Sequence, residues 1–72
     1  MNRHDPVFPR AREARIRYLD ADFQVLEEGD YVRCAVTGQP IKLDDLRYWS
    51  VDRQEAYLDA AASFQAYRDR FR

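Results

Sequence analysis

Hydrophobic residues in the first half of the chain recur in short alternating runs. Between residues 13 and 18, Ala14, Ile16 and Tyr18 alternate with charged residues. A period of two is typical of a strand with one buried face. Similar runs follow, separated by turn-forming Asp and Gly, so the pattern predicts four short strands, at about residues 13–19, 23–27, 31–36 and 40–43. Gly38 lies in the last predicted turn, and Pro40 begins the last strand.

The last third of the chain has the clearest helix pattern. Ser50 is a suitable N-cap, and acidic residues follow it while Arg68, Arg70 and Arg72 end the chain, as the helix dipole favours. We predict a helix over about residues 51–70. Its apolar stripe would be Tyr57, Leu58, Ala61, Phe64 and then Tyr67 or Phe71. At about 1.5 Å per residue the helix would reach past a small sheet. Phe64, Tyr67 and Phe71 are therefore candidates for a partner surface.

These elements predict an α+β fold, in which a small antiparallel β-meander of short strands is followed by one long C-terminal α-helix packed on the sheet. Residues 1–10 contain two prolines and no apolar period, so they are predicted to form a flexible arm that includes His4. Residues 11–72 would form a single domain. We expect Trp49 and Tyr48 to tie the sheet to the helix, with Leu58 at the contact.

The composition of the chain limits the kinds of metal or cofactor site that it can form. The chain has 72 residues and a net charge of −1, and Cys34 and His4 are its only cysteine and histidine. A protein zinc site uses three or four ligands, so we predict no metal and no cofactor. The single cysteine, the absence of a long apolar run and the absence of a hydrophobic signal segment predict a cytoplasmic protein without a membrane span.

The residues that can carry chemistry have simple structural interpretations. Cys34 could be a reactive thiolate, but no histidine in the predicted domain could act as its base, and cysteine is often buried in cores. Carboxylate pairs at Asp20 with Asp22 and at Asp44 with Asp45 are expected to bind backbone amides in turns. Ser50 has no accompanying base. We therefore predict no catalytic residue and no enzymatic activity.

Basic and aromatic residues are predicted to share the solvent-facing sides of two strands. Alternation places Arg15 and Arg17 on one strand and Tyr31 and Arg33 on another. If these strands are neighbours, the four side chains form a surface suited to phosphates and bases. The alternative is an ordinary solvated face whose arginines pair with Glu13, Glu27 and Glu28.

The segment CAVTGQP, residues 34–40, resembles half of a zinc knuckle in which Thr37 replaces the second cysteine. Treble-clef zinc modules continue with a second ligand pair where a strand meets a helix, and YWSVDR resembles that element with Trp49 and Arg53 in the ligand positions. The resemblance implies a metal-free relative in which packing by Trp49 replaces the metal as the clip between hairpin and helix.

A longer resemblance covers residues 15–63. The segments YLDADFQVL, VRCAVTG and LRYWSVDRQEAY are similar to a family of short bacterial proteins known as domain-of-unknown-function family 2093. That resemblance implies a small cytoplasmic protein and supplies no activity, cofactor or catalytic residue.

The function that we expect is non-catalytic: a protein-interaction or adaptor module that binds an unidentified protein or a second copy of itself through the aromatic end of the helix. The alternative is weak binding of RNA or single-stranded DNA through the arginine and tyrosine face.

Overall fold

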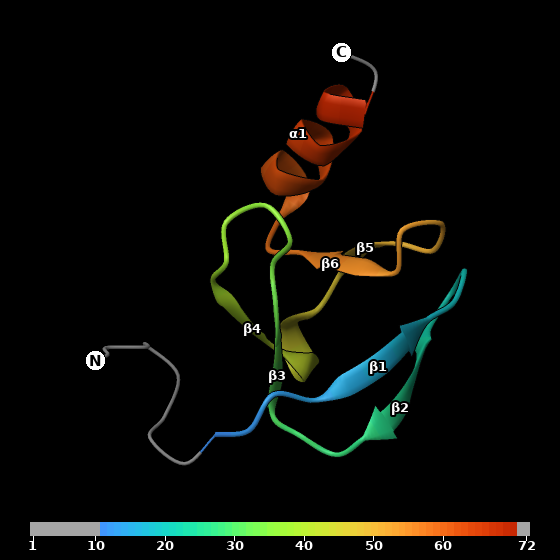
Figure 1. The fold of residues 1–72 in the computed structure, drawn as a ribbon, viewed down its shortest axis with the longest axis vertical. Helices are drawn as coiled ribbons and strands as arrows, with labels where there is room; N and C mark the ends of the chain where they lie inside the picture. The colour runs from blue at the N-terminus through green and yellow to red at the C-terminus, as the bar shows by residue number, and fades with distance from the viewer. Residues whose placement is uncertain (1–10, 71–72) are drawn as a thin grey trace.

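The computed structural model describes residues 11–70, which form three strand pairs and one helix (Figure 1). The predicted arm, His4, Phe71 and Arg72 lie outside the described residues. The elements in chain order are β1 (Arg15–Tyr18), β2 (Phe23–Glu27), β3 (Tyr31–Arg33), β4 (Pro40–Lys42), the 3₁₀ turn η1 (Leu43–Asp45), β5 (Tyr48–Ser50), β6 (Glu55–Tyr57) and α1 (Ala60–Arg70).

The α+β class is confirmed: short antiparallel strands are followed by a C-terminal helix packed on them. The strands form three two-stranded sheets, β1–β2, β3–β4 and β5–β6, instead of one continuous meander. The four predicted strands are present, mostly shortened by a residue or more at their ends. Isolated parallel bridges join the pairs, from Glu13 to Tyr31 and from Cys34 to Ala56.

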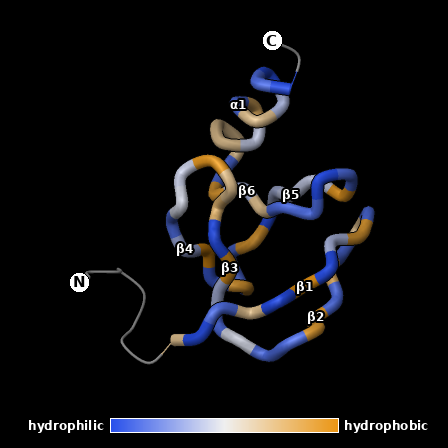
Figure 2. Tube along the Cα trace, viewed as in Figure 1, coloured by the Kyte–Doolittle hydropathy of each residue, from blue (hydrophilic) through white to orange (hydrophobic). Residues whose placement is uncertain are grey.

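The core lies where the sheets and the helix meet. Figure 2 shows hydrophobic and hydrophilic residues alternating along β1, as expected of a strand with one buried face. The buried residues of the core cluster come from both halves of the described chain, although β2, η1 and β5 contribute none: Ala14, Tyr18, Val32, Cys34, Ile41, Leu46, Ala56, Tyr57 and Ala62. Most are small or medium in size, so the core is thin.

The predicted start of the helix at residue 51 is wrong. Residues 51–54 form a turn, β6 follows, and α1 begins only at Ala60. The cap is Asp59, whose Oδ1 accepts the Ala62 backbone N–H at 2.8 Å. Ser50 Oγ does accept a backbone N–H, that of Arg53 at 3.1 Å, but this bond closes the β5–β6 turn. The same local hydrogen bond therefore serves a hairpin in place of a helix start.

The shorter helix also changes its apolar face. Tyr57 is buried in β6 and Leu58 is half-buried ahead of the helix, so neither belongs to the helical stripe. Within α1, Ala62 and Ala66 pack against the core, whereas Phe64 and Tyr67 point outward with 61% and 60% of their surfaces exposed. Eleven residues at about 1.5 Å each make a helix of roughly 16 Å.

Candidate functional site

Trp49 joins β5 to the β1–β2 hairpin. Its indole Nε1–H donates to the Leu19 carbonyl at 2.7 Å. Its ring lies edge-on to Phe23, with centroids 5.9 Å apart, and is tilted against Tyr18 at 6.1 Å. We predicted that Trp49 clips the knuckle hairpin to the helix, whereas its hydrogen bond and ring contacts lie with the N-terminal hairpin. Tyr48 stands opposite Tyr57 in the β5–β6 pair, and 41% of its surface is exposed.

Gln54 is a joining residue that sequence reasoning missed. Its side chain binds both backbone groups of Tyr18: Oε1 accepts the N–H and Nε2 donates to the carbonyl, each at 2.9 Å. Nε2 also donates to the Val51 carbonyl at 2.8 Å. Gln54 has a φ of 54°, which is uncommon for a residue with a side chain. No local sequence signal marks such a residue, because its partner lies 36 positions away.

Cys34 sits at the centre of the knuckle between β3 and β4. Its thiol is 3% exposed, and Sγ accepts backbone N–H groups from Thr37 at 3.4 Å and from Leu58 at 3.2 Å. The Gly38 N–H donates to the Cys34 carbonyl at 2.9 Å, and Gly38 has a φ of 77°, so the predicted glycine turn is confirmed. The Leu58 bond ties the knuckle to the start of α1.

The surroundings of Cys34 act on the pKa of its thiol in two opposing ways. Burial acts to raise the pKa of this thiol, but hydrogen bonds from Thr37, Leu58 and Val36 outweigh it and lower the pKa below its usual value. The sulfur is nevertheless enclosed, and its neighbours are N–H donors instead of a proton-accepting side chain. This arrangement is that of a packed structural thiol, consistent with the core interpretation of Cys34.

The knuckle is followed by a hairpin and then a helix, an order shared with treble-clef modules, but its residues do not fit zinc. Within residues 11–70, no group of three His, Cys, Asp or Glu side chains could hold a metal ion. The contact that reaches Cys34 Sγ from outside the knuckle is the Leu58 backbone N–H, at 3.2 Å. Hydrogen bonds to sulfur thus connect the two halves of this unit.

The proposed basic and aromatic face is only partly assembled. Arg15, Arg17 and Arg33 are exposed, but Tyr31 is buried, with 8% of its surface accessible. The Arg33 guanidinium lies over the Tyr31 ring, 5.3 Å from its centroid. Arg15 pairs with Glu27 across β1 and β2 at 3.5 Å. The prediction that Tyr31 faces solvent is wrong, because the parallel bridge to Glu13 places it beneath the N-terminal segment.

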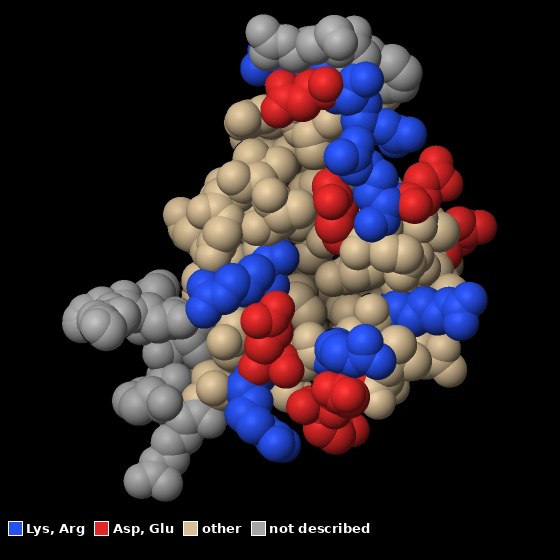
Figure 3. All heavy atoms as spheres, viewed as in Figure 1, with Lys and Arg blue, Asp and Glu red and all other residues tan. Residues whose placement is uncertain are grey.

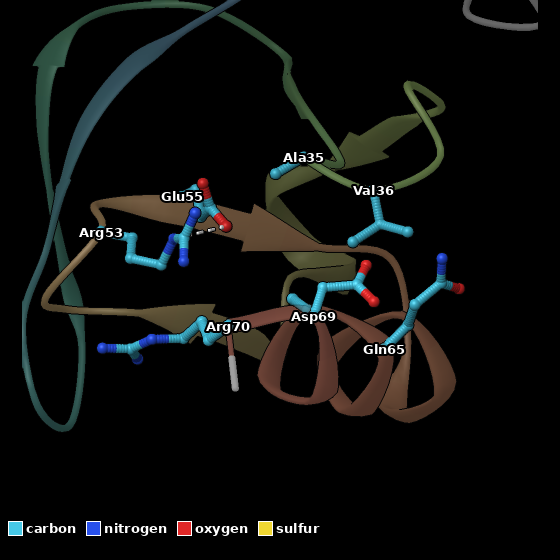
Figure 4. Close-up of a pocket in the computed structure, with 8 residues that line it drawn as sticks. Ala35, Val36, Arg53, Glu55, Gln65, Asp69 and Arg70 are labelled. Carbon is cyan, nitrogen blue, oxygen red and sulfur yellow. Dashed lines mark ion pairs between the residues drawn. The ribbon is translucent and has the colours of Figure 1, made fainter. Parts of the chain in front are cut away.

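A cavity of about 330 Å³ lies beside α1, between the helix, the knuckle and the β5–β6 turn (Figure 4). In Figure 4, Gln65 and Asp69 extend from the helix toward Val36, while Arg70 points away. Arg53 pairs with Glu55 at 3.5 Å, and Tyr57 donates its hydroxyl to the same carboxylate oxygen at 2.8 Å. Both signs of charge line the cavity, and no lining residue is a nucleophile paired with a base.

The acidic pairs have structural contacts that agree in part with the predicted turn roles. Asp22 Oδ1 accepts the Phe23 backbone N–H at 2.7 Å, next to the β1–β2 turn. Asp44 and Asp45 belong to η1, where the Asp44 carbonyl accepts a hydrogen bond from Arg47. None of these contacts forms a catalytic arrangement.

The described residues therefore define a class of small domain in which a knuckle, a hairpin and a helix are joined through a buried thiol. A comparison with protein families matches residues 25–66 to the family described as "Uncharacterized protein conserved in bacteria (DUF2093)". Because the match covers more than half of the chain, the protein belongs to this family, as the sequence segments indicated. No match was found among curated proteins or among solved structures. None of the described helices is long and apolar enough to span a membrane.

Proposed function

We propose that this protein is a non-catalytic protein-interaction module and that the outer face of α1 is its contact surface. The observation that carries the proposal is the orientation of the helix. Ala62 and Ala66 face the core, while Phe64 and Tyr67, one turn apart, project outward with about three-fifths of their surfaces exposed. A helix that contributes only to stability would bury its large aromatic side chains instead.

The chemistry of this face is that of protein interfaces. Aromatic and arginine side chains are enriched where proteins bind one another, because they bury a large area for a small loss of conformational entropy. The Arg68 guanidinium lies 5.7 Å from the centroid of the Phe64 ring. Phe64, Tyr67 and Arg68 together offer two apolar rings beside one positive charge.

A capture experiment tests the proposal. The tagged full chain is used to capture proteins from a lysate of its own host, with and without nuclease, and compared with the double variant Phe64→Ala/Tyr67→Ala. We expect a protein that survives nuclease and is lost with the double variant. Because both side chains are exposed, thermal unfolding should change little, which separates lost binding from lost folding.

A matched control lies on the opposite part of the molecule. Arg17→Ala/Gln24→Ala changes two exposed side chains of the β1–β2 hairpin and should leave the captured protein in place. Equal capture by the helix variant and the native chain would contradict the proposal. Self-association through α1 would be detected by sedimentation as a concentration-dependent mass that the helix variant lacks.

Weak binding of RNA or single-stranded DNA remains the alternative proposal, supported by the exposed side chains of Arg15, Arg17 and Arg33. Two observations make nucleic-acid binding less well supported than protein binding through α1. The Tyr31 ring is buried, and Figure 3 shows positive and negative side chains interspersed over the face in view. Phosphate contacts release counterions, so this proposal requires binding that weakens steeply with salt and with Arg15→Glu/Arg17→Glu.

A further inference from the structure

We propose that the free edge of β2 binds an extended apolar segment of a partner protein, flanked by Lys or Arg, by adding it as a third strand to the β1–β2 sheet. This surface is separate from the outer face of α1, so the inference does not depend on the function proposed for the helix. Addition of a strand to an open sheet edge is a common form of peptide recognition.

The backbone of β2 has hydrogen-bonding groups that point away from β1. In the described chain, β2 has β1 as its one strand neighbour. The β1–β2 turn is closed by a hydrogen bond from the Leu19 N–H to the Asp22 carbonyl at 2.8 Å, so these two residues form a hydrogen-bonded pair. Along antiparallel strands, hydrogen-bonded residue pairs alternate with non-hydrogen-bonded pairs, whose backbone N–H and carbonyl groups point away from the partner strand. Tyr18 with Phe23 and Ile16 with Val25 are therefore the non-bonded pairs.

The β1 side of the sheet supports this alternation. The outward backbone groups of Tyr18 are the ones that Gln54 binds. On the β2 side, the Phe23 N–H is taken by Asp22. The N–H and carbonyl of Val25 are left directed outward from the edge. An added strand would pair with Val25 at its centre.

The side chains at this edge are unusually apolar for an open strand. Val25 and Leu26 are 41% and 51% exposed. Exposed edge strands normally carry features that prevent pairing, such as charges or bulges. Here the register shifts between Arg15 and Ile16, so the regular part of the edge is limited to about Phe23–Val25. A short partner segment fits such an edge better than a long strand.

The charges around β2 specify the flanks of the partner. Residues 19–30 contain five acidic residues and no Lys or Arg, and the acids lie on both sides of the apolar centre. They are Asp20, Asp22, Glu27, Glu28 and Asp30. The nearby Arg15 pairs with Glu27 at 3.5 Å and offsets the charge of that one carboxylate. Basic flanks on the partner would complement both ends of the edge.

The experiment uses the full chain and three sets of nine-residue peptides. The five central positions are randomised among Val, Ile, Thr and Leu, and the flanks are Lys-Arg, Ser-Ser or Glu-Asp. Binding is followed by peptide anisotropy and by the emission of Trp49, whose ring contacts Phe23 on β2. We expect the Lys-Arg set to bind about tenfold more tightly than the Ser-Ser set, as several exposed ion pairs would produce.

Two variants of one residue separate the backbone from the side chain. Val25→Pro removes the outward N–H without removing a bond of the β1–β2 ladder and should abolish binding. Val25→Ala keeps that N–H and should reduce binding only a few-fold. A charge-reversed chain, Asp20→Lys/Glu28→Lys, leaves the edge intact and should shift the preference toward the Glu-Asp set even if the proline variant fails to fold.

Several results would overturn the inference. Absence of binding in all three sets, equal binding by the three sets, or equal binding by a folded Val25→Pro chain would each do so. Peptide binding that disappears with Phe64→Ala/Tyr67→Ala but survives Val25→Pro would assign the peptide to α1 and support only the function proposed there. Dimerisation lost with Val25→Pro would assign the edge to a second copy of the chain.

Discussion

The β1–β2 hairpin and the unit from β3 to α1 are held together in different ways. In the hairpin, Tyr18 is the one buried strand residue, and Val25 and Leu26 remain exposed. The unit from β3 to α1 contributes most of the core and is closed by the hydrogen bonds to Cys34. The family match begins at residue 25, inside β2, and so covers the second region almost completely. The hairpin thus contributes fewer buried side chains than the unit that it joins.

The contacts between the regions are few and specific. Trp49 and Gln54 of the β5–β6 hairpin hold Leu19 and Tyr18. At the other end, the Ala14 N–H donates to the Tyr31 carbonyl at 2.7 Å. Gly29 lies so close to Ala14 that an added Cβ would come within 2.4 Å of its backbone nitrogen. The comparison teaches that polar contacts, added to the core position of Tyr18, can hold a hairpin most of whose side chains stay exposed.

The largest expected effect comes from the core of the second region. Ile41→Ala should lower the free energy of unfolding by about 2–5 kcal/mol, because it leaves a cavity at a buried position in the core. Urea unfolding followed by circular dichroism measures the loss. Val25→Ala in the hairpin is the control and should cost less than about 0.5 kcal/mol. Equal losses would mean that the two regions share one core.

Removal of Trp49 should separate the two regions. Trp49→Ala removes the ring contacts with Tyr18 and Phe23 and the bond to Leu19, and we expect it to cost about 3 kcal/mol. In this variant, hydrogen exchange should show that the backbone amides of β1 and β2 lose more protection than those of β3 to β6. Trp49→Phe, which retains a ring but lacks the donor, should cost only about 1 kcal/mol. Uniform loss of protection would contradict this separation of the two regions.

Variants of Gln54 test the hydrogen bonds between the β5–β6 turn and the backbone of Tyr18. Gln54→Ala should cost about 1–2 kcal/mol, because both backbone groups of Tyr18 lose their partner. Gln54→Gly also loses these bonds, but glycine adopts the φ of 54° without steric strain. The glycine variant should therefore unfold at a higher urea concentration than the alanine variant. The reverse order would show that backbone strain is unimportant at this turn.

The smallest effect concerns the helix cap within the second region. Asp59→Ala should cost about 1 kcal/mol through loss of the bond to the Ala62 N–H. The amides at the start of α1 should lose protection while the β1–β2 amides keep theirs. Ser50→Ala is the matched comparison, and its effect should appear in the β5–β6 turn. Protection lost in α1 upon Ser50→Ala would support the longer helix predicted from sequence and contradict a role for Ser50 in the β5–β6 turn.

Local patterns determined several parts of this protein. Alternation between residues 13 and 18 predicted β1, because the period of side-chain burial is a property of the strand itself. Gly38 marked its turn through a φ that favours glycine. The alanine-rich segment predicted the position of α1, although not its start. Similarity in the segments around β2, the knuckle and β5 identified the family.

Only the tertiary structure decided what the residues between 49 and 58 do. Ser50 and the acidic residues after it are as compatible with a hairpin turn as with the start of a helix. In both structures a side chain accepts the backbone N–H of the residue three positions later, as Ser50 does from Arg53. Pairing with β5 and the bridge from Ala56 to Cys34 selected the strand. The roles of Trp49, Gln54 and Cys34 were settled in the same way. Their partners lie 24 to 36 residues away, beyond the reach of any local pattern.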